Sequence, residues 1–228
     1  VAGCGDEMLA SQVIQLGAYE YLPKNKINSA SICRVINNTL ERCRLRNDVK
    51  RAQAKMAEMS IVDELTKLRN RRYFIEVLEG EFERARRYET EMALIMMDLD
   101  YFKKINDTYG HLAGDMVLSE IGKILKEHVR RSDLACRYGG EEFAVILPNT
   151  SRDNIYAAYD RFREMVSKHP FEYGSKQFHI TVSIGIAFSN DAKSIEDILA
   201  HADQALYQAK ETGRNKVATY TTGNEQDD

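Results

Sequence analysis

The sequence predicts an α/β fold of the α+β kind, with a mixed or antiparallel sheet flanked by helices. Two observations indicate this fold class. Stretches with apolar residues at helical spacing alternate along the chain with short apolar runs of strand length. Two of these runs, 134–138 and 143–147, flank Gly139-Gly140, a dipeptide typical of hairpin turns, so this pair is expected to be antiparallel.

Composition is that of an ordinary globular protein. The 228 residues are 43% hydrophobic and 29% charged, with a formal net charge of −3. Such a chain is not expected to hold nucleic acid on a broad basic face. No apolar run approaches the roughly 18–20 residues that span a bilayer, and nothing resembles a signal peptide. The four cysteines form no CxxC pair. We therefore expect a cytoplasmic protein without a membrane or nucleic-acid partner.

The first part of the chain predicts three elements. A helix over 5–17 is expected to end at Gly17, and a strand over 18–22 is expected to end at Pro23. A long helix then begins with Asn28 or Ser29 as its N-cap. The first residue is valine rather than methionine, so we expect the chain to begin inside a longer protein.

The long helix carries two apolar stripes. The first consists of Ile32, Ile36, Leu40 and Cys43. The second has the alternating spacing of a coiled-coil seam over about two heptads, and consists of Leu45, Val49, Ala52, Met56 and Met59. Either this segment pairs with a second copy of the chain, or it packs as an ordinary amphipathic helix on its own domain.

The larger part of the chain alternates between the two periodicities. Helices are predicted around 73–85, 117–125, 155–166 and 195–209, the last closed by Gly213. Strands are predicted at 92–97, 134–138, 143–147 and 179–188. These patterns divide the chain into residues 1–45, a helical linker at 46–61, a main domain at 62–222 and a polar tail at 223–228 that we expect to be disordered.

Acidic residues lie where the buried strands are expected to end. Asp98 and Asp100 follow the apolar run 92–97. A buried carboxylate is costly unless something neutralises it, and Mg²⁺ does so while leaving positions for substrate phosphates. The alternative is that Asp98 and Asp100 cap the helix that follows.

A second pair of carboxylates follows the diglycine turn. Side chains alternate along a strand, so Glu141 and Glu142 are expected to point different ways, and to have separate roles, unless the turn re-aims one of them. The glycines leave room for a triphosphate to approach the backbone. Together with Asp98 on a neighbouring strand, these glutamates indicate a two-metal phosphoryl-transfer site, although solvated glutamates after a glycine turn are common.

The stretch Tyr138-Gly-Gly-Glu-Glu-Phe143 resembles the signature of the GGDEF-domain diguanylate cyclases, in its GGEEF form. Other stretches match the same family in the same order over residues 62–220, namely 63–72 (with Lys67 where glycine is usual), 98–107, 110–115, 183–185 and 202–215. The resemblance implies a palm-like, nucleotide-cyclase-like fold. It also implies condensation of two GTP molecules into cyclic di-GMP and pyrophosphate with Mg²⁺ or Mn²⁺ as cofactor.

The resemblance also implies a role for each matching residue. The metal ligands would be Asp98, the carbonyl of Leu99, Glu141 and Glu142, and Glu141 would also be the catalytic residue that eases deprotonation of the attacking 3′-hydroxyl. The substrate-binding residues would be Lys103, Asn106, His111, Asp115, Gly139, Gly140, Lys210 and Arg214.

The two guanine-binding assignments have a physical basis, and two of the phosphate-binding assignments have a plain alternative. Asn106 and Asp115 would hold guanine, because a buried carboxylate accepts from N1–H and the exocyclic amine, a donor pair that adenine lacks. Lys103, Lys210 and Arg214 would face phosphates. Alternatively, Lys210 and Arg214 are simply cations one turn apart at a helix end, where they are favourable in any case.

Each such domain would bind one GTP, so the resemblance implies catalysis by a homodimer with two facing sites. It also implies a product-inhibition site in which Arg130 and Asp133, with Arg161 as a further partner, bind cyclic di-GMP. Arginine can engage guanine through O6 and N7, and aspartate can accept from its Watson–Crick edge. The plain alternative for 130–133 is a basic helix end followed by a turn-forming aspartate.

Residues 17–24 resemble the fifth-strand segment of a two-component receiver domain, with Lys24 as its switch lysine. Asn25 replaces the usual proline, and Ala2 stands where threonine or serine is expected. The resemblance implies that residues 1–45 are the C-terminal part of a receiver, whose partner would be a histidine kinase if the whole domain exists. Two alternatives to the enzyme stay open: an inactive module that binds GTP or cyclic di-GMP as a sensor, and a scaffold that dimerises through residues 30–60.

Overall fold

The computed structural model describes residues 27–59 and 61–221, except for the side chains of 52–59. The chain divides into two compact units, residues 1–60 and 61–228. The helix expected at 5–17, the strand expected at 18–22 and the tail at 223–228 lie outside the described residues. Among the residues that the structure describes, no helix has both the length and the apolar character needed to cross a membrane.

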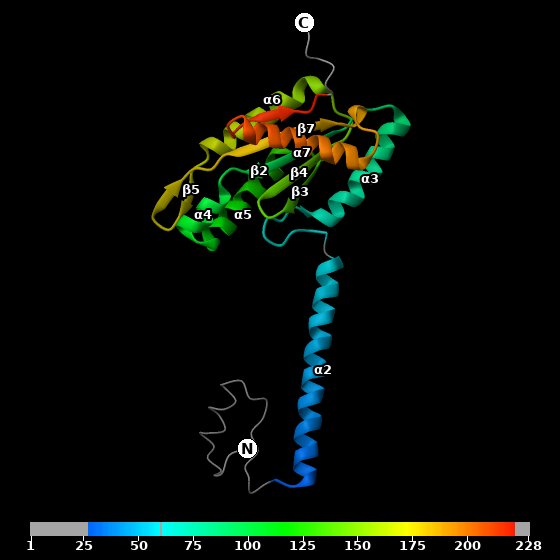
Figure 1. The fold of residues 1–228 in the computed structure, drawn as a ribbon, viewed down its shortest axis with the longest axis vertical. Coiled ribbons are helices and arrows are strands. Elements are labelled where there is room, and N and C mark those ends of the chain that lie inside the picture. Colours follow the sequence, from blue (N-terminus) through cyan, green and yellow to red (C-terminus); the bar gives the residue numbers. More distant parts are fainter. Residues whose placement is uncertain (1–26, 60, 222–228) are drawn as a thin grey trace. The chain divides into compact units, whose positions relative to one another are not determined.

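The described part of the first unit is the helix α2, Ser29–Met59 (Figure 1). Asn28 caps its first turn, because its Oδ1 accepts from the Ser31 N–H at 2.8 Å and its own N–H donates to Ser31 Oγ at 2.9 Å. Of the two expected N-caps, the structure therefore selects Asn28. The apolar stripes are exposed as far as their side chains are described, with Ile36 at 51% and Val49 at 55%, except for the half-buried Cys43.

The second unit is built on a six-stranded sheet in the order β1-β3-β4-β2-β7-β8. Its strands are β1 Arg69–Asn70, β2 Ala93–Leu99, β3 Leu134–Gly139, β4 Glu142–Leu147, β7 Val182–Phe188 and β8 Val217–Thr219. The central strands β3, β4, β2 and β7 are antiparallel, whereas β1 and β8 join the edges in parallel. The predicted α+β class with a mixed sheet is confirmed.

Helices cover both faces of this sheet (Figure 1). They are α3 Arg71–Tyr88, α4 Phe102–Tyr109, α5 His111–His128, α6 Arg152–Lys168 and α7 Ile195–Glu211. Alternate residues of β2 face opposite ways: Ile95 packs with α5 and α6, whereas Leu94 packs with α3 and α7. Every residue of β2 is buried for this reason, which is why its sequence is a continuous apolar run as far as Asp98.

The sequence patterns missed the shortest strands. β1, β8 and the separate hairpin formed by β5 Phe171–Tyr173 and β6 Lys176–Phe178 have two or three residues each, too few to show an alternation. The strand expected at 179–188 begins only at Val182, because residues 179–181 connect the β5–β6 hairpin to β7.

Candidate active site

The site begins where β2 ends. Asp98 lies directly opposite Glu142 on β4 and opposite Ser183 on β7. Its side chain is almost buried, and its Oδ2 lies 2.8 Å from Nζ of Lys210, which comes from the last turn of α7. The structure therefore brings the predicted metal ligands Asp98 and Glu142 together and pairs Asp98 with a predicted phosphate-binding residue.

The turn that joins β3 to β4 is shifted from its expected position by one residue. Gly139 is the last residue of β3 and pairs with Glu142, after a register shift between Arg137 and Gly139. The turn therefore consists of Gly140, with φ +39°, and Glu141, rather than of the two glycines. An irregularity of this kind re-aims side chains. It leaves both glutamates within electrostatic reach of Asp98 and Lys210.

Negative charge is concentrated here. Burial raises the pKa of Asp98, Glu141 and Glu142, and the charge on Asp98 adds to the rise at both glutamates. Lys210 opposes the rise in pKa at all three carboxyls. The charge on Asp203 further raises the pKa of Glu142. We call Asp98, Glu141, Glu142 and Asp203 the carboxylate cluster.

The donors of this cluster fit a hard divalent cation. Mg²⁺ takes oxygen ligands, and it is usually bound by one or two carboxylates together with water and substrate phosphates. In the described residues no three His, Cys, Asp or Glu side chains already surround a metal-sized position. The mutual repulsion that raises the pKa of the glutamates is what a bound cation would relieve. Asp98 and Glu142 are the two carboxylates that the sheet sets directly opposite each other.

Arg137 holds the turn between β3 and β4 in place, a role that the sequence did not predict. The guanidinium of Arg137 donates to the Gly140 carbonyl at 3.0 and 2.8 Å, and its Nη1 lies 3.4 Å from Oδ2 of Asp63. Burial alone would raise the pKa of Asp63, but hydrogen bonds from Thr66 and Arg137 hold it below its usual value. Arg137 therefore ties the glutamate turn to the first loop of this unit.

The expected guanine-binding residues come from two packed helices. Asn106 lies half-buried in α4, and Asp115 lies in the first turns of α5. A Cβ at Gly114 would lie 3.0 Å from Cγ of Asn106 and closer still to its Oδ1, so only glycine allows this packing. Asp115 is exposed, which differs from the expected buried carboxylate, so a bound base would itself have to cover it. Lys103 on α4 and His111, the first residue of α5, are also exposed.

One of the alternatives raised by the sequence is wrong, and a second is wrong for Arg214, although Lys210 does lie in the last turn of its helix. Asp98 and Asp100 do not cap α4, whose N-cap is Tyr101 without a side-chain hydrogen bond. Asp100 instead accepts from the hydroxyls of Thr181 and Ser183. Arg214 is not one helical turn from Lys210, because α7 ends at Glu211 and Arg214 lies in the following turn with φ +61°.

The sequence Arg130–Asp133 forms a tight turn after α5. The Arg130 N–H donates to Asp133 Oδ2 at 2.8 Å, and the Asp133 N–H donates to the Arg130 carbonyl at 3.0 Å. The turn borders a groove of about 620 Å³ whose lining includes the cations Lys67, Arg69, Lys126, Arg130 and Arg131. Arg161 is exposed on α6, and both it and Asp133 act on His128: burial lowers the pKa of His128, Arg161 lowers it further, and Asp133 opposes them.

Comparison with known proteins identifies the second unit. The family described as "Diguanylate cyclase, GGDEF domain" matches residues 60–216. Diguanylate cyclase A of Treponema denticola is 41% identical over 169 residues, which are 72% of this chain and 45% of that protein. The response regulator PleD of Caulobacter vibrioides is 35% identical over 209 residues, which are 90% of this chain and 46% of that protein.

A solved structure has the same fold. The GGDEF domain of DgcB from Caulobacter crescentus, in complex with c-di-GMP, matches with a TM-score of 0.69 and 33% identity, covering 71% of this chain and 94% of that one. The chain spans less than half the length of the two curated relatives named above. The family match covers more than half of this chain and includes every strand of the six-stranded sheet except β8, together with the carboxylate cluster. The chain therefore belongs to the GGDEF-domain diguanylate cyclase family.

Proposed function

We propose that this chain is a diguanylate cyclase that condenses two GTP molecules into one cyclic di-GMP and two pyrophosphates. The observation that carries the proposal is the carboxylate cluster at the end of β2 and the β3–β4 turn, with Lys210 2.8 Å from Asp98. Relatives that share the family bear the name diguanylate cyclase, and one structural neighbour is an active GGEEF domain from Vibrio cholerae, 34% identical.

Each residue has a distinct task in the proposed reaction. The 3′-oxygen of one GTP forms a bond to the α-phosphorus of the other, the bond from that phosphorus to the bridging oxygen breaks, and pyrophosphate leaves. Glu141 accepts the 3′-hydroxyl proton, and the raised pKa of its carboxyl suits it to that role. A divalent cation, when bound by Asp98, Glu141, Glu142 and the Leu99 carbonyl, supplies charge neutralisation at the phosphates.

The substrate is held at both ends. Lys210, Arg214 and Lys103 bind phosphates, the Gly139-Gly140 backbone lets them approach, and Asn106 and Asp115 bind guanine, with His111 beside them at the start of α5. Two copies of the chain supply the two nucleotides, so the active form is a homodimer. The exposed stripe of α2 supports pairing through a coiled coil, and the structure of a DgcB fragment that matches this chain comprises a coiled coil and a GGDEF domain.

The proposal is tested by incubating the purified chain with GTP and Mg²⁺, or Mn²⁺, and identifying the products. We expect two pyrophosphates for each cyclic di-GMP, and no reaction when a chelator removes the metal. Bound GTP that stays intact would instead show an inactive nucleotide-binding module. Absence of any nucleotide binding would favour a dimerising scaffold.

Replacing Gly114 with alanine is expected to raise the KM for GTP about tenfold, because the new methyl group displaces Asn106 from its place against α5. The maximal rate should fall less, since the carboxylate cluster is untouched. Steady-state kinetics would check this. Gly80→Ala is the matched control, because a Cβ there meets nothing within 4 Å. Equal KM values for the Gly114 variant and the wild type would contradict the assignment of Asn106.

Product inhibition at the Arg130–Asp133 turn is part of the proposal, with Arg161 as a further ligand. The Asp133 contact uses the main chain of Arg130, so Arg130→Ala should keep the turn and remove only the guanidinium. We expect the concentration of cyclic di-GMP that halves the rate to rise at least about tenfold. The uninhibited rate should not change. Lys123→Ala, on the exposed face of α5, is the control. Identical inhibition curves for Arg130→Ala and the wild type would refute the site.

The N-terminal segment is proposed to be the end of a receiver domain, over residues 1–45, followed by the helical linker 46–61 and the cyclase domain 62–222. The match to the response regulator PleD covers 209 residues, more than residues 61–228 contain, so it reaches into the first unit. This supports the receiver assignment. It makes a histidine kinase the upstream partner if the whole protein holds a complete receiver.

A further inference from the structure

The turn after α7 has an unusual backbone. Gly213, Arg214 and Asn215 have φ values of +120°, +61° and +46°. Left-handed conformations are unfavourable for residues other than glycine, and two in succession persist only when the surroundings hold them. Arg214 is one of the proposed phosphate-binding residues, so what holds this turn matters for the site.

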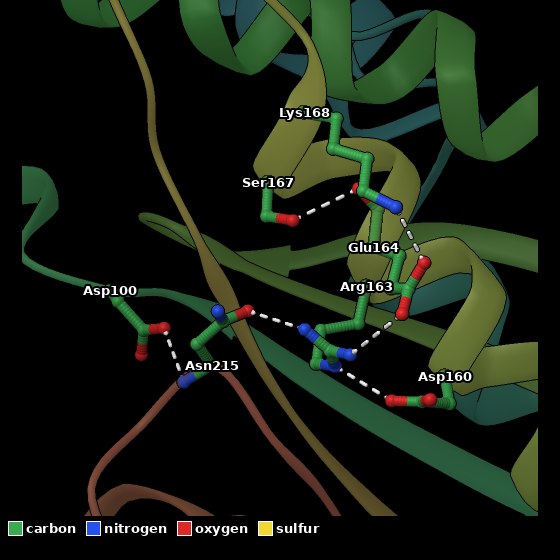
Figure 2. Close-up of polar contacts among 7 residues, drawn as sticks. All are labelled: Asp100, Asp160, Arg163, Glu164, Ser167, Lys168 and Asn215. Carbon is green, nitrogen blue, oxygen red and sulfur yellow. Dashed lines mark hydrogen bonds and ion pairs between the residues drawn. The ribbon is translucent and has the colours of Figure 1, made fainter.

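The Arg214 N–H donates to the Ala209 carbonyl of α7 at 3.0 Å, and the first anchor from outside α7 is the carboxylate of Asp100, which is 3% exposed. Its Oδ2 accepts from the backbone N–H of Asn215 at 2.9 Å, a contact between residues 115 positions apart in the chain (Figure 2). The remaining contacts fix the carboxylate itself: the hydroxyls of Thr181 and Ser183 donate to it at 2.6 and 2.7 Å. Asp100 thus joins the turn to residues at and just before the start of β7.

A second anchor comes from α6. Nη1 of Arg163 donates to Oδ1 of Asn215 at 3.0 Å (Figure 2). The guanidinium is itself held by Asp160, with 2.7 Å between Nε and Oδ1, and by Glu164. The turn is therefore fixed through its backbone by Asp100, the residue that follows β2, and through the Asn215 side chain by α6.

Both ends of the Asp100–Asn215 link lie beside site residues. Asp98 is two residues before Asp100, and Arg214 is one residue before Asn215. Tyr101 adds a second contact between the same two segments, because the guanidinium of Arg214 lies 4.9 Å from the centre of the Tyr101 ring. A shift of this turn would change the position of Arg214 relative to the end of β2 that carries Asp98.

We infer that Asp100 is a positioning residue that acts through Asn215 to set the phosphate-binding turn against the metal-binding end of β2. The inference rests on the proposed function of this site. It assigns to Asp100, Asn215 and Arg163 a role in binding the triphosphate, separate from the guanine-binding residues on α4 and α5. A role confined to stability would lower the folded fraction without favouring one nucleotide over another.

The test measures nucleotide affinity directly, by calorimetry with Mg²⁺ present. One ligand is an α,β-methylene analogue of GTP, which cannot react, and the other is GMP. We expect Asp100→Ala to weaken the GTP analogue at least about tenfold while GMP changes much less. Asp100→Asn should restore most of the affinity, because the amide oxygen can still accept from the Asn215 N–H and the Thr181 hydroxyl, and the Ser183 hydroxyl can reverse to accept from the amide NH2.

A milder variant keeps the test decisive if Asp100→Ala does not fold. Arg163→Ala removes only the outer anchor and should weaken the GTP analogue about threefold, again with little effect on GMP. Lys168→Ala, at the far end of the same network, is the control and should match the wild type (Figure 2).

The outcomes separate this inference from the proposed function. Normal turnover in the wild type with unchanged analogue affinity in the Asp100 and Arg163 variants would overturn the positioning role alone. Selective loss of analogue affinity with no turnover in the wild type would support the positioning role and overturn the cyclase. A wild type that binds neither nucleotide would overturn both.

Discussion

Replacing Asp98 with asparagine is expected to lower cyclic di-GMP formation by about a thousandfold, equivalent to ~4 kcal/mol of transition-state stabilisation. The substitution keeps the shape of a nearly buried side chain but removes its charge, which lies opposite Glu142 and pairs with Lys210. A neutral amide is a poor ligand for a hard cation, and Lys210 would lose the partner that now holds it.

The same substitution is not expected to destabilise the metal-free domain. The charge on Asp98 raises the pKa of Glu141 and Glu142 in the folded state, so the ionised cluster opposes folding at neutral pH. Removing one charge relieves that repulsion. Thermal unfolding without metal should therefore show a midpoint close to that of the wild type.

Product formation and unfolding are measured on the same preparations. Asp107→Asn, an exposed carboxylate on α4, serves as the control and should retain full activity. An Asp98→Asn variant that is folded and within tenfold of the wild-type rate would show that this carboxylate does not hold the metal.

The second large effect concerns Gly185, where α7 packs on β7. A Cβ at this position would lie 2.8 Å from the Cα of Leu206 and closer still to the Ala202 carbonyl oxygen, both in the backbone of α7. Backbone cannot rotate away as a side chain can. We expect Gly185→Ala to lower the free energy of unfolding by about 3 kcal/mol, or about 10 °C in midpoint, because the helix must move off the sheet.

Activity should fall together with stability, because Lys210 and Asp203 are carried by the displaced helix. Urea unfolding of the Gly185 variant, with Gly80→Ala as the matched glycine control, would check this. Equal unfolding midpoints for Gly185→Ala and the wild type would mean that α7 lies farther from β7 than the structure places it.

The main elements of this fold could be predicted because their burial repeats along the sequence. In α3, Phe74, Leu78, Phe82 and Ala85 recur at helical spacing and are all buried. Strand β2 could be recognised as a continuous apolar run because both its faces are covered. The edge strands β1 and β8 could not be predicted, because their place in the sheet depends on pairing with residues far along the chain.

The sequence was enough to predict which residues carry the chemistry of the site, but not which residues hold them in place. Asp98 stood out because it follows a buried apolar run, and Glu141 and Glu142 because they follow the diglycine turn. The clamp by Arg137 and the shift of the turn to Gly140 and Glu141 depend on an irregular register that no local pattern shows. Asp203 had a usable signal, since it precedes Lys210 by seven residues, two turns along one face of α7.

The measurement that tests the central claim most directly is the initial rate of product formation from GTP and Mg²⁺ over a wide range of protein concentrations. Products are separated by chromatography and identified by mass. We expect cyclic di-GMP, formed at a rate that rises more steeply than in proportion to protein, because each of two copies brings one nucleotide. GTP that remains intact with protein shown to be dimeric would contradict the claim that this carboxylate cluster makes cyclic di-GMP.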